Sequence, residues 1–227
     1  MITPYDGSLP DGRRIAENLK KGEGPVAAGL EITSAEQSAR DLTAAGVKTK
    51  DPIPGPFMRP GEKEPPPTRR WSILFADELA SRPLFLIQYI RATPRRAGPP
   101  PNPNSAFALA TLMIAGNDPE QAAAGYGNIG KVKDQEIPLP EFGAAGKEIV
   151  LERGSILLLR ATDLAGPTAR RLKERGEGIL AVRMTATDLN QARKQVGEKN
   201  VSKEDQSVLV APENAAGVWL EFQIPRP

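Results

Sequence analysis

The sequence lacks two residue types that carry much of protein chemistry: its 227 residues include no cysteine and no histidine. Without cysteine, disulfides and thiolate nucleophiles are excluded. Without histidine, Ser-His-Asp and Cys-His nucleophile systems and nearly all zinc sites are excluded. Any catalysis by this chain would therefore use Asp, Glu, Lys, Arg, Tyr or an imported cofactor.

Long apolar runs and a strong charge of one sign are also missing. No stretch reaches the roughly 18 apolar residues that a membrane-spanning helix needs. Residues 1–6 (MITPYD) have neither the basic nor the apolar region of a signal peptide. The 30 basic and 28 acidic residues leave a net charge of +2, which favours no polyanionic partner. We therefore expect a soluble, cytoplasmic protein with no membrane and no nucleic-acid partner.

The chain does contain a repeat. Residues 22–33 (GEGPVAAGLEIT) return as residues 176–187 (GEGILAVRMTAT), and a weaker copy covers residues 107–115. Each copy has the composition of an apolar strand and runs into the start signal of a helix. Ser34, Asp118 and Asp188 are the expected N-caps, each with a glutamine three residues later. Three such starts, each after a β-rich run, predict a duplicated structural unit.

Each predicted helix is followed by short apolar runs rather than by a second helix. These runs predict strands over residues 71–75, 84–90, 132–137, 148–151, 156–159, 208–210 and 218–222. The repeated unit is therefore strand–helix–strand–strand–strand. We expect an α+β fold in which helices cover the outer face of curled mixed sheets and the other face lines a cleft.

Two proline-rich stretches interrupt the repeats. Residues 94–104 are expected to be an extended linker. This linker divides the chain into one half over 1–93, with an incomplete first unit and a second unit, and another half over 105–227, with the third and fourth units. The other stretch, residues 51–67, lies inside a repeat, where it either drapes over a cleft or is a plain insertion.

Three segments carry a resemblance to a known family: residues 70–75 (RWSILF), 83–89 (PLFLIQY) and 217–222 (GVWLEF). Together with the repeated units, they resemble the vicinal oxygen chelate superfamily, and within it the glyoxalase-like domain proteins of the glyoxalase/bleomycin resistance/dioxygenase type. The resemblance implies βαβββ units paired around a curled sheet. It also implies a divalent metal in many members, held by a first-strand His and a last-strand Glu.

These ligand positions are only partly matched here. The first-strand positions, which carry no ligand atom, fall near Ala28, Ala108 and Ala181. The last-strand positions fall at Gln88, Leu158 and Glu221. The resemblance thus implies Glu221 and Gln88 as the metal ligands if a divalent metal is bound.

The amino terminus bears on the same question. Residues 1–4 (MITP) resemble the end of a last strand, with the rest of that unit missing. Either the reading begins at an internal start or the protein lacks that unit, and we favour truncation. A missing unit could restore His and Glu ligands. Edge strands that it leaves open would favour a homodimer.

Glu221 is the strongest candidate for a base or a metal ligand. Strand alternation places it on one face with Trp219 and Gln223, whereas Val218, Leu220 and Phe222 should meet the helices. An exposed glutamate on a terminal strand is the alternative. The walls of a small-molecule site are predicted to come from Gln88, Arg70, Trp71 and Trp219.

Three functions remain open. The first is binding of a small carbonyl or carboxylate metabolite by a metal-dependent lyase, isomerase or ring-cleaving dioxygenase, with Glu221 as base or ligand. The second is a non-catalytic small-molecule-binding or drug-sequestering protein on the same scaffold, which the lack of histidine favours. The third is a structural or regulatory protein with a degenerate cleft.

Overall fold

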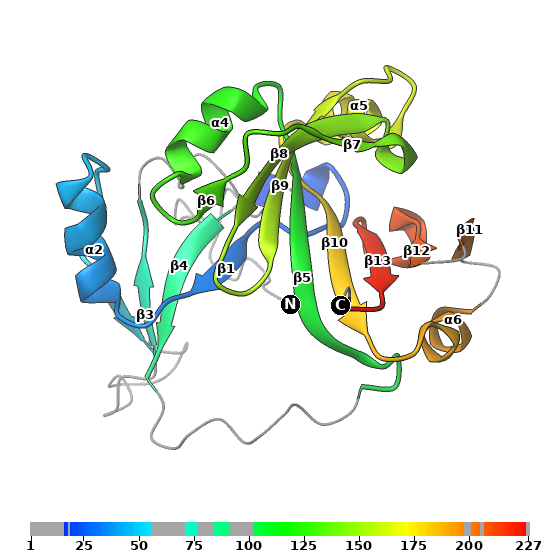
Figure 1. The fold of residues 1–227 in the computed structure, drawn as a ribbon, viewed down its shortest axis with the longest axis horizontal. Helices are drawn as coiled ribbons and strands as arrows, with labels where there is room; N and C mark the ends of the chain where they lie inside the picture. Colours follow the sequence, from blue (N-terminus) through cyan, green and yellow to red (C-terminus); the bar gives the residue numbers. More distant parts are fainter. Residues whose placement is uncertain are drawn as a thin grey trace. The chain divides into compact units, whose positions relative to one another are not determined.

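The computed structural model describes residues 16–17, 19–55, 71–76, 84–90, 102–197, 201–204 and 207–225 (Figure 1). Its contacts divide the chain into two compact units. The smaller unit is Ala27–Gly98, and the larger unit combines Met1–Val26 with Pro99–Pro227. Most of the predicted linker 94–104 and of the proline-rich stretch 51–67 lies outside the described residues, so the predicted domain limits stay a prediction.

The smaller unit is one strand–helix–strand–strand–strand repeat. Its elements are β1 (Ala28–Glu31), α2 (Ala35–Ala44), β2 (Ile53–Gly55), β3 (Trp71–Leu74) and β4 (Leu84–Tyr89). The four strands pair in the order β1-β4-β3-β2, with β1 and β4 parallel. Ser34 caps α2 as predicted, because its side chain accepts the N–H of Gln37.

The larger unit contains two further copies of the repeat. The first is β5 (Ala106–Ala115), α4 (Pro119–Tyr126), β6 (Lys131–Val132), β7 (Ile137–Leu139), η1 (Pro140–Phe142), β8 (Ala144–Val150) and β9 (Ser155–Ala161). After α5 (Pro167–Arg175) comes the second: β10 (Gly178–Ala186), α6 (Leu189–Val196), β11 (Val201–Glu204), β12 (Ser207–Val210), η3 (Pro212–Asn214) and β13 (Trp219–Gln223). The α+β fold and the βαβββ repeat are therefore confirmed.

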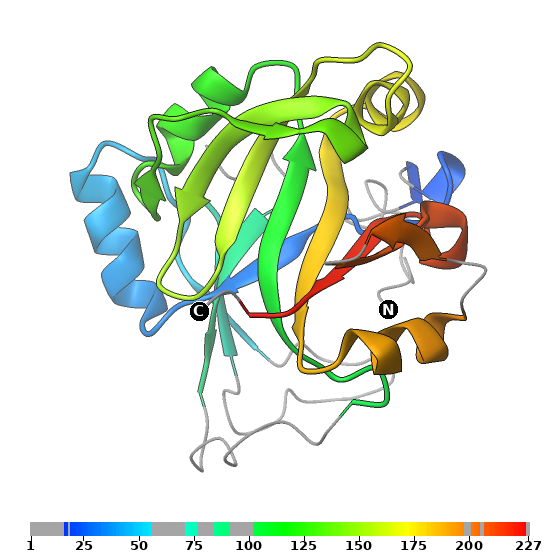
Figure 2. The ribbon, with the colours of Figure 1, turned by 45° about the vertical axis from the view of Figure 1, so that its right-hand side comes forward.

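One sheet joins these two copies in the order β11-β12-β13-β10-β5-β9-β8-β6, with β7 paired to β8. The first strands of the copies, β5 and β10, are antiparallel neighbours at its centre. Because they run in opposite directions, α4 follows β5 near one end of the sheet and α6 follows β10 near the other (Figure 2). Asp118 and Asp188 cap these helices as predicted, accepting N–H groups of the first turn.

The helix-covered face of β13 is the one that alternation predicts. Phe222 is buried with Val208 and Val210 of β12 and Ala192 of α6, and Leu220 packs against the same cluster. Burying a large apolar side chain of this kind contributes about 1.5–3 kcal/mol relative to leaving it exposed. Trp219, Glu221 and Gln223 consequently lie on the opposite face of the strand.

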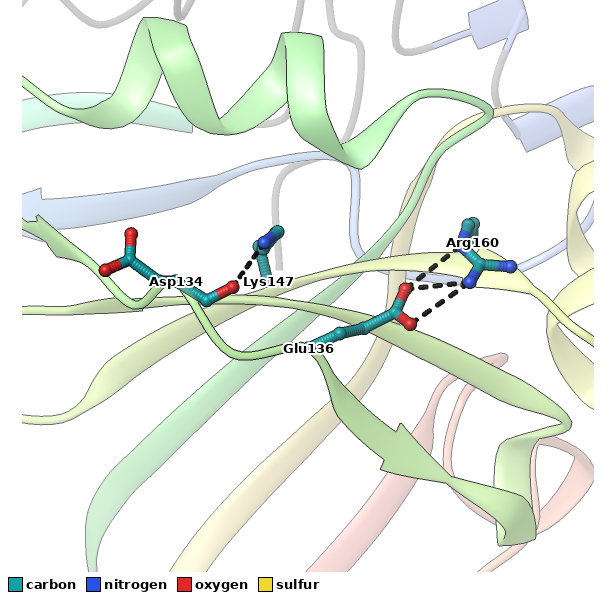
Figure 3. A network of polar contacts seen from close by, with 4 residues as sticks. All are labelled: Asp134, Glu136, Lys147 and Arg160. Atoms are coloured by element: carbon teal, nitrogen blue, oxygen red, sulfur yellow. Dashed lines mark hydrogen bonds and ion pairs between the residues drawn. The ribbon is translucent and has the colours of Figure 1, made fainter.

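The strand predicted over residues 132–137 is wrong in one respect: it is two short strands, β6 and β7, both paired to β8. Between them, Lys133 still donates its backbone N–H to Glu148 of β8, and two further contacts involve side chains of β8 and β9 (Figure 3). The carbonyl oxygen of Asp134 accepts a hydrogen bond from Lys147 at 2.5 Å, and Glu136 pairs with Arg160 at 2.9 Å.

Two arginines of α5 hold the two Gly-Glu-Gly segments of the repeat. Arg175 donates to the carbonyl oxygens of Gly22, at 3.0 Å, and Glu23. Arg171 donates to the carbonyl oxygen of Gly176 at 2.5 Å. Burial, and secondarily the charge of Arg175, lowers the pKa of Arg171 to about 10, so this side chain is still a cation at neutral pH. Both segments are therefore held to α5 of the larger unit by hydrogen bonds to their backbone carbonyl oxygens.

Candidate functional site

A line of polar side chains crosses the face of the large sheet that lies opposite α6. Ser155 of β9 lies opposite Thr111 of β5, Thr111 lies opposite Arg183 of β10, and Arg183 lies opposite Glu221 of β13. Directly paired residues on neighbouring strands point to the same face. We call Ser155, Thr111, Arg183 and Glu221 the polar row.

A buried ion pair lies at the centre of this row. Arg183 Nε donates to Glu221 Oε2 at 2.7 Å, and the two side chains are only 15% and 5% exposed. Glu221 Oε1 accepts a second hydrogen bond, at 2.5 Å, from the side-chain amide of Gln223. Both carboxylate oxygens therefore have donors, and the negative charge has a cation beside it, as a buried charge requires.

The other half of the row is a pair of hydroxyl groups. Thr111 Oγ1 and Ser155 Oγ lie 3.1 Å apart, and both residues are buried. Because each hydroxyl carries one proton and only one proton is used between them, one O–H donor is left over. The row thus combines a cation, a carboxylate and a hydroxyl donor that has no acceptor among the residues the structure describes.

Arg183 keeps most of its donors available. Within the described part of the chain only its Nε has a hydrogen-bond acceptor, so Nη1 and Nη2 present four N–H groups without a protein partner. Neither Nη atom is fully enclosed, so water or a small ligand can reach them. A guanidinium with free, accessible Nη donors is suited to a carboxylate or a carbonyl oxygen.

The neighbouring positions on the same face are apolar. Leu157 of β9, Met113 of β5, Ala181 of β10 and Trp219 of β13 pair in the same order across the sheet. We call these four residues the apolar row. They belong to one cluster together with Leu139, Phe142, Leu159 and Leu209.

Phe142 covers part of the apolar row. Its ring meets Trp219 edge-on, with centroids 6.0 Å apart and planes at 78°. The segment that carries it ends at Gly143, whose φ of 57° favours glycine. A Cβ there would approach the Cα of Gly166 to 3.1 Å. This turn fixes Phe142 over the sheet, and Thr168 Oγ1 donates to its carbonyl oxygen at 2.8 Å.

The residues predicted for the site are distributed over both units. Glu221 and Trp219 share one face of β13 in the larger unit. In the smaller unit, the amide oxygen of Gln88 accepts the backbone N–H of Ala35 at 3.1 Å, on the sheet face that α2 covers. Trp71 points to the opposite face, where its indole lies against Gly55. Arg70 lies outside the described residues, and the predicted roles of all five stay predictions.

The atoms at Glu221 that could coordinate a metal do not fit a divalent ion. A metal would need carboxylate oxygens at about 2.0–2.6 Å, but both oxygens of Glu221 already accept hydrogen bonds from Arg183 and Gln223. Across the described residues there is no group of three or more His, Cys, Asp or Glu side chains that could hold a metal ion. We therefore derive no chemistry through a metal here.

Sequence reasoning missed Arg183, Thr111 and Ser155. The signal for Arg183 was available, because it is the one charged residue in the run 179–184 (ILAVRM). A charge in a core strand requires a partner. Nothing in the sequence distinguishes Thr111 and Ser155 from other hydroxyl residues, because their contact depends on the pairing of β5 with β9.

Residues 4–130 match the family model of the glyoxalase-like domain. The match covers more than half of the chain, which therefore belongs to the glyoxalase-like domain family, within the vicinal oxygen chelate superfamily that its sequence resembles. No curated protein matches the chain in sequence. No helix among the described residues is long and apolar enough to cross a membrane.

Several solved structures resemble about half of this chain. Methylmalonyl-CoA epimerase from Mycobacterium tuberculosis is 20% identical, with a TM-score of 0.46 over 54% of this chain and 91% of its own. A hypothetical protein from Bacillus halodurans C-125 is 22% identical, with a TM-score of 0.44 over 53% and 95%. Streptomyces coelicolor methylmalonyl-CoA epimerase in complex with 2-nitronate-propionyl-CoA is 16% identical, with a TM-score of 0.46 over 54% and 100%. These likenesses concern the fold.

Proposed function

We propose that this protein binds a small metabolite bearing a carboxylate or carbonyl group at the polar row, without a metal. The observation that supports this is the Arg183 guanidinium, which is bonded to Glu221 through Nε and has accessible Nη donors with no partner among the described residues. A carboxylate placed there would gain charge-assisted hydrogen bonds. The leftover hydroxyl donor of the Thr111–Ser155 pair offers a further contact.

Trp219, at the end of the apolar row, supplies the other half of the recognition. Trp219 is partly exposed and stands one row away from Arg183, on the strand beside it. Its ring can pack against an apolar group on the same ligand. The expected ligand is therefore amphipathic, with an acidic or carbonyl head at Arg183 and an apolar tail at Trp219.

Binding is favoured over catalysis by the state of Glu221. Each oxygen of this carboxylate already accepts a hydrogen bond, one from a guanidinium and one from an amide, so neither is left without a donor to take up a proton from a ligand. We therefore propose non-catalytic binding first. Proton abstraction by Glu221 from an enolisable ligand is the second candidate, because its carboxylate lies beside the Nη groups that would hold such a ligand.

The experiment is ligand-detected NMR with three related probes: phenylpyruvate, 3-phenylpropionate and phenylacetone. The first carries both polar groups, the second only the carboxylate and the third only the carbonyl. Arg183→Gln should weaken the binding of phenylpyruvate by about tenfold to hundredfold, because a hydrogen bond to a charged group is lost. Arg160→Gln, which alters the exposed Arg160–Glu136 pair, is the matched control and should change nothing.

The same spectra separate the two candidates. In D2O, probe signals that stay as constant as in a protein-free sample indicate binding alone. Loss of the α-C–H signal by deuterium exchange, faster with the wild type than without protein and not accelerated by Glu221→Gln, indicates proton abstraction. If no probe binds, or if Arg183→Gln binds phenylpyruvate as the wild type does, the proposal is wrong.

A further inference from the structure

We infer that Arg183 is the resident cation of the polar row and takes the place of a divalent metal, so that replacing it with a shorter ligating side chain would open the carboxylate of Glu221 to a metal ion. This inference concerns the site of the proposed function but does not depend on a ligand binding there. It follows from the charge of Glu221, from the register of β10 against β13, and from the residues at the equivalent positions in the other copy of the repeat.

The charge of Glu221 needs a partner at this depth. Glu221 is only 5% exposed, and a buried carboxylate needs a cation or a proton close by. In the described part of the chain its only charged partner is Arg183, and Gln223 is neutral. A metal ion at this carboxylate would lie close to the guanidinium on Oε2, and two cations at one buried carboxylate repel each other strongly.

Strand register fixes the position of Arg183 beside Glu221. Arg183 and Glu221 are directly paired on the parallel strands β10 and β13, so their side chains leave the same face side by side. The backbone therefore sets their contact, and no loop has to order to make it. A shorter ligating side chain at position 183 would leave Glu221 Oε2 without its donor at 2.7 Å. That oxygen would then be available to an incoming ion.

The other copy of the repeat carries apolar residues at the equivalent positions. Met113 precedes its helix cap, Asp118, by the same interval as Arg183 precedes Asp188, and Leu157 corresponds to Glu221 through strand pairing. Both apolar residues are almost fully buried. The equivalent position in the other copy thus supplies no metal ligand and no cation, which leaves Arg183 as the only charge-balancing group on these two rows.

The test is metal uptake measured by native mass spectrometry and by titration calorimetry with Zn²⁺ and Mn²⁺. The wild-type protein should take up no stoichiometric ion. Arg183→His should bind Zn²⁺ at least about tenfold more tightly than the double variant R183H/E221Q, which keeps the imidazole but lacks the carboxylate charge. Arg160→His is the matched control: its carboxylate partner, Glu136, is exposed, so it should gain no comparable site.

One divalent ion per wild-type chain, lost in Glu221→Gln, would overturn the inference. So would equal Zn²⁺ affinity in R183H and R183H/E221Q. Circular dichroism first establishes that the histidine variants fold. If they do not, the comparison of wild type with Glu221→Gln still decides whether a metal occupies the site. Failure of all three carboxylate and carbonyl probes, with no metal uptake by the wild type, would instead refute the proposed function alone.

Discussion

The polar row and the apolar row occupy equivalent places on the same sheet, yet they hold different chemistry. Strand pairing puts Met113 beside Leu157 and Arg183 beside Glu221. Both pairs are largely buried: the first is at most 2% exposed, and the second is 15% and 5% exposed. Backbone position and depth are therefore similar, and the side chains alone make one pair part of the core and the other a candidate binding site.

The two copies of the repeat use these equivalent positions differently. In the first copy, the paired positions extend the core, and Phe142 packs onto that core through Trp219. In the second copy, the same positions carry an ion pair, and the Nη groups of its arginine have no acceptor among the described residues. A duplicated fold can thus place core residues in one copy and a candidate binding site in the other while the strands stay the same.

The largest expected effect comes from making the second copy resemble the first. Arg183→Met leaves the carboxylate of Glu221 buried without its cation, so we expect a loss of about 3–5 kcal/mol in the free energy of unfolding. The double variant R183M/E221L copies the Met113–Leu157 pair and should lie within about 1 kcal/mol of the wild type or above it. Urea denaturation measures both. A double variant as unstable as the single one would show that the rows are not interchangeable.

A smaller effect is expected at the hydroxyl end of the polar row. Thr111→Val keeps the shape of the side chain but leaves the hydroxyl of Ser155 without its partner, which should cost about 1–3 kcal/mol. Adding Ser155→Ala removes the hydroxyl that has lost its partner and should recover part of that loss in stability. Thermal unfolding of the single and double variants checks this. Additive losses would mean that the 3.1 Å contact contributes nothing.

The smallest effect should come from the exposed ion pair. Arg160 and Glu136 are 43% and 38% exposed, so Arg160→Gln should cost only about 0.2–1 kcal/mol. That cost should shrink as salt is added, because exposed charges are screened. The cost of Arg183→Met should change little over the same salt range. Equal salt dependence of the two variants would contradict the difference in burial between the pairs.

The sequence predicts the local features of this fold well. The three N-caps depend only on neighbouring residues, and all three are found where the pattern puts them. The faces of β13 are predicted equally well, because polar and apolar residues alternate along it. The family is confirmed as well, through segments whose order along the chain is enough to recognise it.

The features that depend on pairing between distant strands could not be predicted. Arg183 and Glu221 are 38 residues apart, and their contact requires the register of β10 against β13. The face to which Gln88 points was equally hidden, because residues 84–87 (LFLI) are apolar on both sides of the strand. Only the position of α2 over one face shows that Gln88 meets the backbone of Ala35.

Arg175 of α5 holds the chain to the larger unit just before the chain enters the smaller unit. The chain leaves the larger unit after Val26 and returns to it at Pro99, so the smaller unit is topologically an insertion with two connections. Arg175 holds the segment before the first connection through the carbonyl oxygens of Gly22 and Glu23. A single cut in residues 94–104 would therefore leave the smaller unit attached through this segment. Since the acceptors are backbone atoms, side-chain changes at Glu23 would leave that tether in place.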